Sequence, residues 1–151
     1  MSIHGNKRLI RSLSTTAGST TNDVQFGGLH TFTDVGTIGG FIVGAKISVN
    51  TGGGSGTYRV HLFKASPTLA GDGSVFTRLF SEDADYLGHF DLGTVEVWGS
   101  VTEAQLYSAL RHPITLGSGG TLYAVCQLVG AGVVSTSGTS GLALTLDVEA
   151  D

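Results

Sequence analysis

The stretch "VNTGGGSGTYRVHLFKASPT", from Val49 to Thr68, carries the two features that decide the fold. Its first half is rich in glycine, like a phosphate-binding loop, and its second half alternates polar and apolar residues, like a β-strand. A Walker loop or a Rossmann turn needs a helix after its last glycine. Here Thr57 and Tyr58 follow Gly56 and begin a strand. We therefore predict that the glycines form a long hairpin connection and bind no ligand.

A period of two, typical of half-buried strands, recurs on both sides of this stretch. It covers residues 41–49, 58–63, 120–129 and 141–149. On the first of these strands the predicted inner face consists of Phe41, Val43, Ala45, Ile47 and Val49. The Gly/Ser/Thr segment at 130–140 is predicted to be a loop. Between the strands, residues 102–112 ("TEAQLYSALRH") are the one helical candidate, with Thr102 as its cap.

These patterns give about seven or eight short strands and no βαβ rhythm. The predicted fold is all-β: an antiparallel β-sandwich of the jelly-roll type with at most one short helix. A length of 151 residues suits about one domain. We expect residues 1–22, which end in small polar residues, to form a flexible or partner-ordered N-terminal arm, and residues 23–151 to form the sandwich.

Charged residues make up only 13% of the chain, whereas about 25% is usual. Either Ser, Thr and Gly cover the surface, or other subunits cover part of it. Because interface centres are depleted in Lys, Glu and Asp, the deficit favours assembly. The net charge of −4 argues against nucleic-acid binding. The basic cluster of Lys7, Arg8 and Arg11 is either a solvated arm or a partner-contact arm that docks on an acidic neighbour.

The sequence contains no apolar run of the length that a membrane span needs, and "MSIHGNKRLI" lacks the apolar core of a signal peptide. We therefore expect synthesis in the cytoplasm and no membrane partner. The single cysteine, Cys126, lies in an apolar run, which predicts a buried and inert thiol.

No catalytic motif stands out, so we predict that the chain is not an enzyme. No Gly-x-Ser-x-Gly elbow occurs. His61 and His89 lie in predicted strands and could meet across a sheet, but histidines with a purely structural role are the favoured interpretation. A hydrolase built on these two histidines and nearby acids is the enzymatic alternative.

The acidic group Glu82, Asp83 and Asp85 lacks the EF-hand spacing, and a solvated loop or the cap of a short turn is the favoured interpretation. Asp72, in "AGDGS", fits an Asx-turn. We therefore predict no metal site and no cofactor. A sugar-binding module would need a row of exposed aromatic residues. The candidates are Trp98, Tyr58, Tyr86, Tyr107 and Tyr123.

The segments "YRVHLFKASPT", "GDGSVF" and "YLGHFDLG", between Tyr58 and Gly93, form a wider pattern. An aliphatic-Phe pair leads into a Ser-Pro-Thr turn, followed by an Asp, a Phe and a Leu-Gly dipeptide. The matching residues are Leu62, Phe63, Ser66, Pro67, Thr68, Asp72, Phe76, Leu87 and Gly88. This pattern, about a quarter of the chain, resembles small structural proteins of tailed bacteriophages.

The resemblance implies a virion component of the capsid decoration (cement) type, located on the capsid surface after synthesis in the host cytoplasm. Such a protein would bind the major capsid protein, join neighbouring subunits and form a homo-oligomer. Trimers suit the three-fold positions of a capsid. The alternative function is a receptor- or glycan-binding sandwich of a head or tail fibre.

Overall fold

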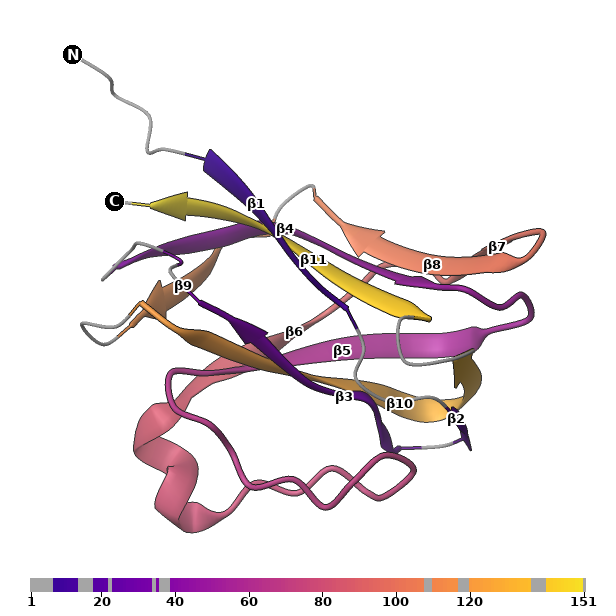
Figure 1. Cartoon of the computed structure of the whole chain (residues 1–151), viewed down its shortest axis with the longest axis horizontal. Helices are drawn as coiled ribbons and strands as arrows, with labels where there is room; N and C mark the ends of the chain where they lie inside the picture. Colours follow the sequence, from indigo (N-terminus) through magenta and orange to yellow (C-terminus); the bar gives the residue numbers. More distant parts are fainter. Residues whose placement is uncertain are drawn as a thin grey trace.

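The computed structural model describes residues 7–13, 18–21, 23–33, 35, 39–107, 110–116, 120–136 and 141–150. Within these ranges the chain forms two antiparallel β-sheets that pack face to face (Figure 1). The helical content of the described residues is one 3-10 turn, η1, at Phe80–Asp85. The predicted all-β sandwich is therefore confirmed.

One sheet has six strands and the other has five. The six-stranded sheet consists of β1 (Lys7–Leu13), β11 (Leu142–Ala150), β4 (Gly39–Val49), β8 (Val101–Leu106), β7 (Glu96–Trp98) and β9 (His112–Thr115), which pairs with β4. The five-stranded sheet consists of β2 (Gly18–Thr21), β3 (Gln25–Phe32), β10 (Leu122–Thr136), β5 (Ser55–Phe63) and β6 (Tyr86–Asp91).

The order of the strands is that of a jelly roll. The chain can be read as one long hairpin, in which β1 pairs with β11, β3 with β10, β4 with β8, and β5 with β6. Rolling up this hairpin brings β11 beside β4 and β10 beside β5. The two Greek keys that result are characteristic of the double-sheet jelly roll, so the predicted type is confirmed as well.

The glycine-rich segment after β4 connects the two sheets, so the predicted hairpin is wrong. β4 belongs to the six-stranded sheet and β5 to the five-stranded sheet. The crossing needs close backbone approach: a Cβ on Gly52 would lie 2.3 Å from the carbonyl oxygen of Gly99. The hydroxyl of Thr102 accepts the amide proton of Gly54 and donates to the carbonyl of Thr51, which fixes the loop against β8. A glycine run between two alternating strands is compatible with a crossing between sheets and with a hairpin, so the sequence pattern does not distinguish the two.

Part of the predicted N-terminal arm belongs to the sheets. β1 pairs along its whole length with β11, and β2 pairs with the end of β10. Ile10 is 8% exposed and belongs to the core. The apolar pattern of β1 is short and interrupted by basic residues, which is why composition alone indicated an arm. The remaining residues of that arm, 1–6, 14–17 and 22, lie outside the described residues.

The predicted helix at 102–112 is wrong. Residues 101–106 form β8, which pairs with β4 and β7, and His112–Thr115 form β9. The spacing of Leu106 and Leu110 is compatible with a helix, but burial of Thr102 and Ala104 on one side of β8 follows a period of two. β10 also continues to Thr136, through much of the segment predicted as a loop.

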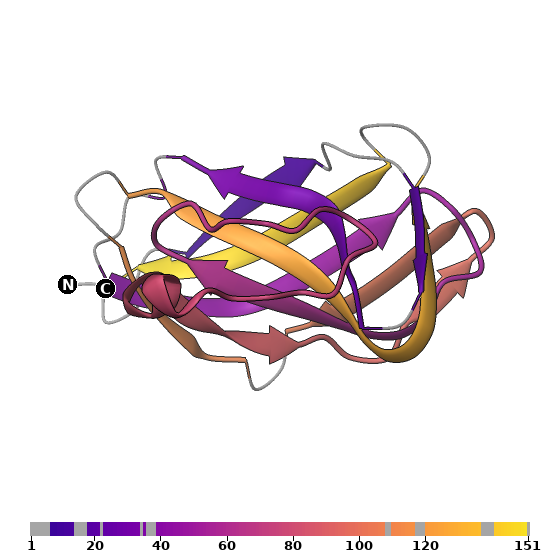
Figure 2. The ribbon, with the colours of Figure 1, turned by 90° about the horizontal axis from the view of Figure 1, so that it is seen from below.

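The long connection between β5 and β6, residues 64–85, lies over the outer face of the five-stranded sheet (Figure 2). Val75 forms a β-bridge with Val24, and the amide of Gln25 donates to the carbonyl of Ser74. The amide of Gly28 donates to the carboxylate of Asp72, 3.0 Å away. This segment, which we call the cover, buries the sheet beneath it.

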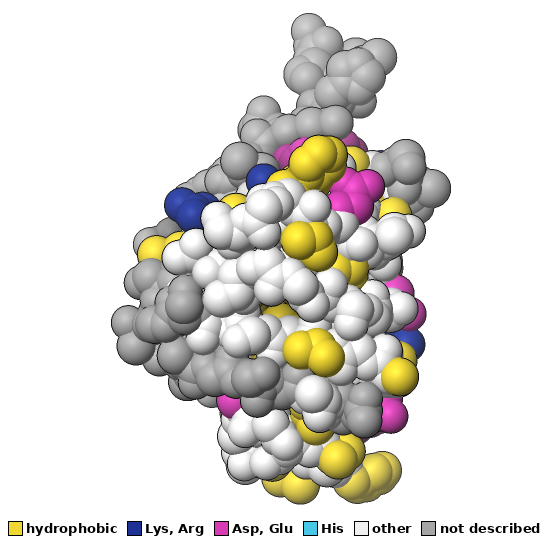
Figure 3. All heavy atoms as spheres, turned by 90° about the vertical axis from the view of Figure 1, so that its right-hand side faces the viewer, with side chains coloured by type: hydrophobic (Ala, Val, Ile, Leu, Met, Phe, Trp, Pro, Cys, Tyr) yellow, Lys and Arg dark blue, Asp and Glu magenta, His cyan; other side chains and the backbone are white. Residues whose placement is uncertain are grey.

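The end of the sandwich at which the β4–β5 crossing and the β7–β8 hairpin lie carries few charges. Figure 3 shows this end, where uncharged polar atoms and backbone predominate among scattered hydrophobic side chains. The low proportion of charged residues in the sequence is therefore visible on this part of the surface.

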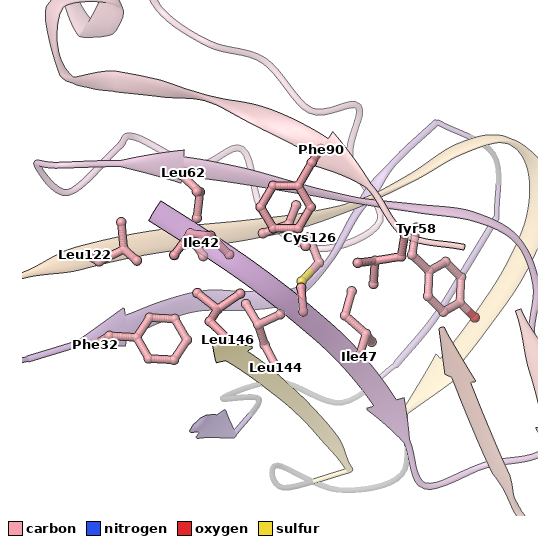
Figure 4. Close-up of a cluster of buried hydrophobic side chains, with 14 of the residues drawn as sticks. Phe32, Ile42, Ile47, Tyr58, Leu62, Phe90, Leu122, Cys126, Leu144 and Leu146 are labelled. Atoms are coloured by element: carbon pink, nitrogen blue, oxygen red, sulfur yellow. The ribbon is translucent and has the colours of Figure 1, made fainter. Parts of the chain in front are cut away.

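The core lies between the sheets and follows the predicted alternation in β5, β10 and β11 (Figure 4). Its members include Tyr58, Leu62, Leu122, Cys126, Leu144 and Leu146, each fully buried. In β4 the alternation changes at a bulge opposite Asp147 and Val148. Ile42 therefore enters the core, whereas Phe41 and Val43, predicted to point inward, are only half-buried.

Candidate functional site

Strand pairing brings His61 and His89 together on the outer face of the five-stranded sheet. They lie directly opposite each other on β5 and β6, and their ring centroids are 5.4 Å apart. Phe76 of the cover stacks on His61 at a centroid distance of 3.9 Å. As a result, His61 is only 4% exposed, whereas His89 remains exposed.

Both ring nitrogens of His61 are used in hydrogen bonds. Nε2 lies 2.7 Å from Oε1 of Gln127 and must donate to it, because an amide oxygen only accepts. Nδ1 of the neutral ring then accepts the hydroxyl proton of Tyr86, 2.8 Å away. The same hydroxyl oxygen accepts a proton from Nδ1 of His89, at 3.0 Å. Burial lowers the pKa of His61 to about 4, which keeps this chain of hydrogen bonds neutral at pH 7.

This cluster is suited to holding the cover in place. Its two hydrogen-bond partners, Tyr86 and Gln127, are not the nucleophile or the carboxylate of a catalytic triad, and among the described residues no serine or cysteine is activated by His61. Arg78 of the cover lies 4.1 Å above the ring of Tyr86. Beside the cluster, Arg59 and Asp91 form an ion pair at 2.6 Å. The geometry favours the structural interpretation of the two histidines over the hydrolase.

The acidic residues also have structural partners. Glu82 accepts the amide protons of Thr68 and Leu79, which lowers its pKa and caps η1 as a short turn. Asp83 pairs with Arg78 at 3.1 Å. Across the described ranges, no three His, Cys, Asp or Glu residues come together as a possible metal site. Cys126 is fully buried, which confirms the predicted buried thiol, and burial raises its pKa.

Two other histidines join parts of the sandwich. His30 is fully buried between the sheets, and its Nδ1 lies 3.0 Å from the hydroxyl of Ser12 on β1. Burial lowers the pKa of His30 to about 4. His112 of β9 donates from Nε2 to the carbonyl of Leu87 on β6, so it links the edges of the two sheets. His4 lies outside the described residues.

The basic residues of the predicted partner-contact arm lie on β1, an edge strand of the six-stranded sheet. In the register with β11, Lys7 is opposite Glu149, Arg8 opposite Val148, and Arg11 opposite Thr145. Arg11 is exposed. The described structure thus places the three residues along one edge of the sheet, with Arg11 on its outer face.

Arg11 lines a hollow of about 310 Å³ on that outer face. The other lining residues are Lys46, Ser48, Tyr107, Ala143 and Thr145. Arg11, Thr145 and Lys46 form one row across β1, β11 and β4. Two cations and three hydroxyls in one hollow can bind an anionic group. Lys46 and Thr145 cannot be recognised as neighbours of Arg11 from the sequence, because only strand pairing brings them beside it.

Among the candidate sugar-binding aromatic residues, exposure separates two from the rest. Trp98 is 63% exposed and Tyr107 is 44% exposed. Tyr58 is fully buried, and Tyr86 belongs to the histidine cluster. Tyr123 is half-buried. Among the described candidates, Trp98 of β7 and Tyr107, which follows β8, are therefore the two that are accessible for contact with other molecules.

The glycine-rich crossing lines a second, open hollow of about 440 Å³. Its walls are residues 54–57 and 92–95. Nothing in this wall is charged, and the strand that begins at Ser55 gives it no helix N-terminus for a phosphate. The glycines form a connection, as predicted, but it runs between the two sheets and is not a hairpin.

No protein-family model matches the sequence, and no curated protein matches it significantly. A chain of the full particle of Israeli acute paralysis virus aligns over 97% of this chain and 70% of its own, with 10% identity and a TM-score of 0.27. A protein of a marine algae virus of the order Picornavirales aligns over 95% and 69%, with 15% identity and a TM-score of 0.25. The hydroquinone 1,2-dioxygenase PnpCD aligns with 12% identity and a TM-score of 0.23, and this chain spans 60% of it. Scores this low support no functional argument.

Within the described part of the chain, no helix is long and apolar enough to cross a membrane.

Proposed function

We propose that this chain is a non-enzymatic structural protein of a virus particle, located on the outside of the capsid of a tailed bacteriophage. In this function it binds the major capsid protein, joins neighbouring capsid subunits and acts as a homo-oligomer, with a trimer favoured by three-fold capsid positions. The resemblance of residues 58–93 to phage structural proteins supports the placement on a phage.

The observation that carries the proposal is the difference between the outer faces of a rigid jelly roll. The cover closes one face, whereas the six-stranded face presents Arg11, Tyr107 and Trp98 to the surroundings. Tryptophan, tyrosine and arginine are the residue types that most often dominate binding at protein interfaces. Many weak contacts of this kind, repeated by symmetry, give high avidity on a shell.

The basic residues of β1 are proposed to contact an acidic neighbouring subunit of the particle. Lys7, Arg8 and Arg11 lie on an edge strand, where a second protein can approach without displacing part of the sandwich. Charges at the rim of an interface act mainly on the association rate and its salt dependence. This contact should therefore weaken as the salt concentration rises.

Gradient co-sedimentation tests the proposal. Capsids of the virus that encodes this chain, prepared without it, should bind the purified chain at a fixed ratio to the major capsid protein. Replacement of Lys7, Arg8 and Arg11 by glutamine should weaken binding by about tenfold at low salt. Lys64→Gln, which removes an exposed cation at the other sheet, is the control and should bind normally. A chain that stays at the top of the gradient contradicts the proposal.

The exposure of Trp98 supports the second candidate, a receptor- or glycan-binding module. A glycan array with the wild-type chain and Trp98→Ala separates the two functions. Glycan binding that is lost with Trp98, together with no binding to capsids, would favour the module.

A further inference from the structure

The turn η1 and the residue before it present two large apolar side chains to the surroundings. Phe80 is 95% exposed, the highest value for a large hydrophobic residue in the described ranges, and its neighbour Leu79 is 47% exposed. We call these two residues the knob. In Figure 1, η1 is the coil at the lower left, at one end of the molecule. Because aromatic side chains are enriched at the centres of protein interfaces, the knob is a candidate anchor for another protein.

Bonds within the chain hold the knob in one conformation. The carboxylate of Glu82 accepts two backbone amide protons of the cover, at 2.6 and 3.2 Å. Arg78 pairs with Asp83 at 3.1 Å and lies over the ring of Tyr86. These charges beside Phe80 therefore have partners already. A turn that is ordered before it binds loses little conformational entropy on binding.

The opposite end of the sandwich carries the uncharged hollow of about 440 Å³, which we call the crossing hollow. It lies where two segments pass between the sheets: residues 50–54 join β4 to β5, and residues 92–95 join β6 to β7. Its lining includes Leu92, 5% exposed, and Val95, which packs against the core. Its volume is within the range of sites that enclose small molecules, so it can receive a phenyl ring.

Exposed apolar side chains border the crossing hollow. Val133 of β10 is 39% exposed and lies opposite Ser55, a lining residue, in the strand register. Val97 is 47% exposed and follows the lining residue Val95 by two positions. Glu96, between these two valines, points to the other side of β7. An apolar side chain from outside would therefore bury apolar surface here without burying an unpaired charge.

The knob and the crossing hollow lie too far apart to meet within one molecule. η1 ends at Asp85, β6 runs from Tyr86 to Asp91, and the lining residues 92–95 follow. Because a strand is extended, the two surfaces lie at opposite ends of β6. A contact between them must join two copies head to tail. Such a contact closes into a ring when its rotation is a whole fraction of a turn.

We propose that Leu79 and Phe80 of one copy bind in the crossing hollow of the next copy, in a ring of three. The inference rests on the homo-oligomer of the proposed function and assigns a contact to it. A second copy is the occupant that fits, because every chain carries one knob and one hollow, both apolar and at opposite ends. The contact uses none of the basic residues of β1, which the proposed function assigns to the capsid.

Sedimentation equilibrium of two single variants tests this contact. The wild-type chain should be a trimer. Phe80→Ala removes the knob, and Thr94→Arg places a long charged side chain in the hollow, so each should raise the dissociation constant by at least about tenfold. Both positions are exposed, and circular dichroism should show an intact sandwich. Leu13→Ala, which shortens an exposed apolar side chain on β1, is the control and should leave the dissociation constant unchanged.

A mixture of the two variants tests the direction of the contact. Phe80→Ala retains an intact hollow, and Thr94→Arg retains an intact knob, so one copy of each can form a single contact that cannot extend. The equimolar mixture should therefore give a 1:1 dimer and nothing larger, at concentrations at which either variant alone is monomeric. Because a single contact lacks the avidity of a closed ring, this dimer should be weaker than the wild-type trimer.

A wild-type chain that is monomeric or dimeric, a trimer that ignores both variants, or a mixture without the 1:1 dimer overturns the inference. Capsid co-sedimentation separates this result from the proposed function. A monomer that still binds capsids would overturn the ring alone. A trimer that depends on Phe80 but never binds capsids would overturn the capsid function alone. Capsid binding that is lost in Phe80→Ala while the trimer persists would assign the knob to the capsid and also overturn the ring contact.

Discussion

On the five-stranded sheet, the outward side chains of Gln25, His61 and Val125 are at most 4% exposed, whereas on the six-stranded sheet Tyr107 and Trp98 are 44% and 63% exposed. The difference comes from the cover, residues 64–85, which lies over the first face. Ordering a segment of this length costs about 1–2 kcal/mol per residue in backbone entropy. One face is thus buried by a long ordered segment. The other face stays exposed and carries residue types that are common at protein interfaces.

The largest expected effect compares an aromatic residue on each face. Phe63, 1% exposed beneath the cover, should cost about 3–5 kcal/mol when replaced by alanine, because its removal leaves a cavity. Trp98→Ala should cost less than about 1 kcal/mol, because its side chain is largely in water. Urea unfolding of both variants measures the difference. Equal losses would show that Trp98 packs against its own chain.

Acid pH should destabilise the covered face. Burial lowers the pKa of His61 to about 4, below the value of about 6.5 in an unfolded chain. The unfolded state therefore takes up the proton first as the pH falls. Stability is complete above about pH 6.5 and decreases toward about pH 4, by up to about 3 kcal/mol for this residue. His30 adds a loss of the same sign over the same range.

Unfolding at several pH values checks this prediction. His61→Gln should have a shallower pH dependence than the wild type, and His89→Gln, at a more exposed position, should change it less. Hydrogen exchange should rise in residues 64–85 before it rises in β11. If His61→Gln has the same pH dependence as the wild type, protonation of another residue causes the loss of stability at acid pH.

A smaller effect is expected at a single anchor of the cover. Asp72→Ala removes the acceptor for the amide of Gly28 and should cost about 1 kcal/mol, the usual value of one such hydrogen bond. Asp83→Ala, in the same segment, removes an exposed ion pair with Arg78 and should cost less than about 0.5 kcal/mol. Proteolysis within residues 64–85 should accelerate only for Asp72→Ala. Equal rates would show that Asp72 does not anchor the cover.

The sequence predicted well wherever a long period of two decides which side is buried. The inner faces of β5, β10 and β11 agree with the prediction, and so does the buried thiol of Cys126. It failed where the pattern is short or interrupted. β1 was predicted as part of an arm, and residues 102–112 were predicted as a helix. Because of the bulge in β4, Ile42 lies in the core, whereas the prediction placed Phe41 and Val43 there.

For the candidate sites, the sequence indicated that His61 and His89 might be neighbours and that Arg11 belonged to a basic cluster. It gave no sign that Lys46 would complete a hollow with Arg11. A single strand shows which residues share a side, but its partners and their register depend on segments far away.

The amino-acid order alone therefore determined the β class, the alternation of buried and exposed residues, and a surface with little charge, because these follow from local geometry and composition. Only the tertiary structure decided that the glycine run crosses between the sheets and that the cover lies on one face and not the other. The physical reason is that such features depend on contacts between distant residues, as when the amide of Gly130 donates to Asp23, 107 positions earlier.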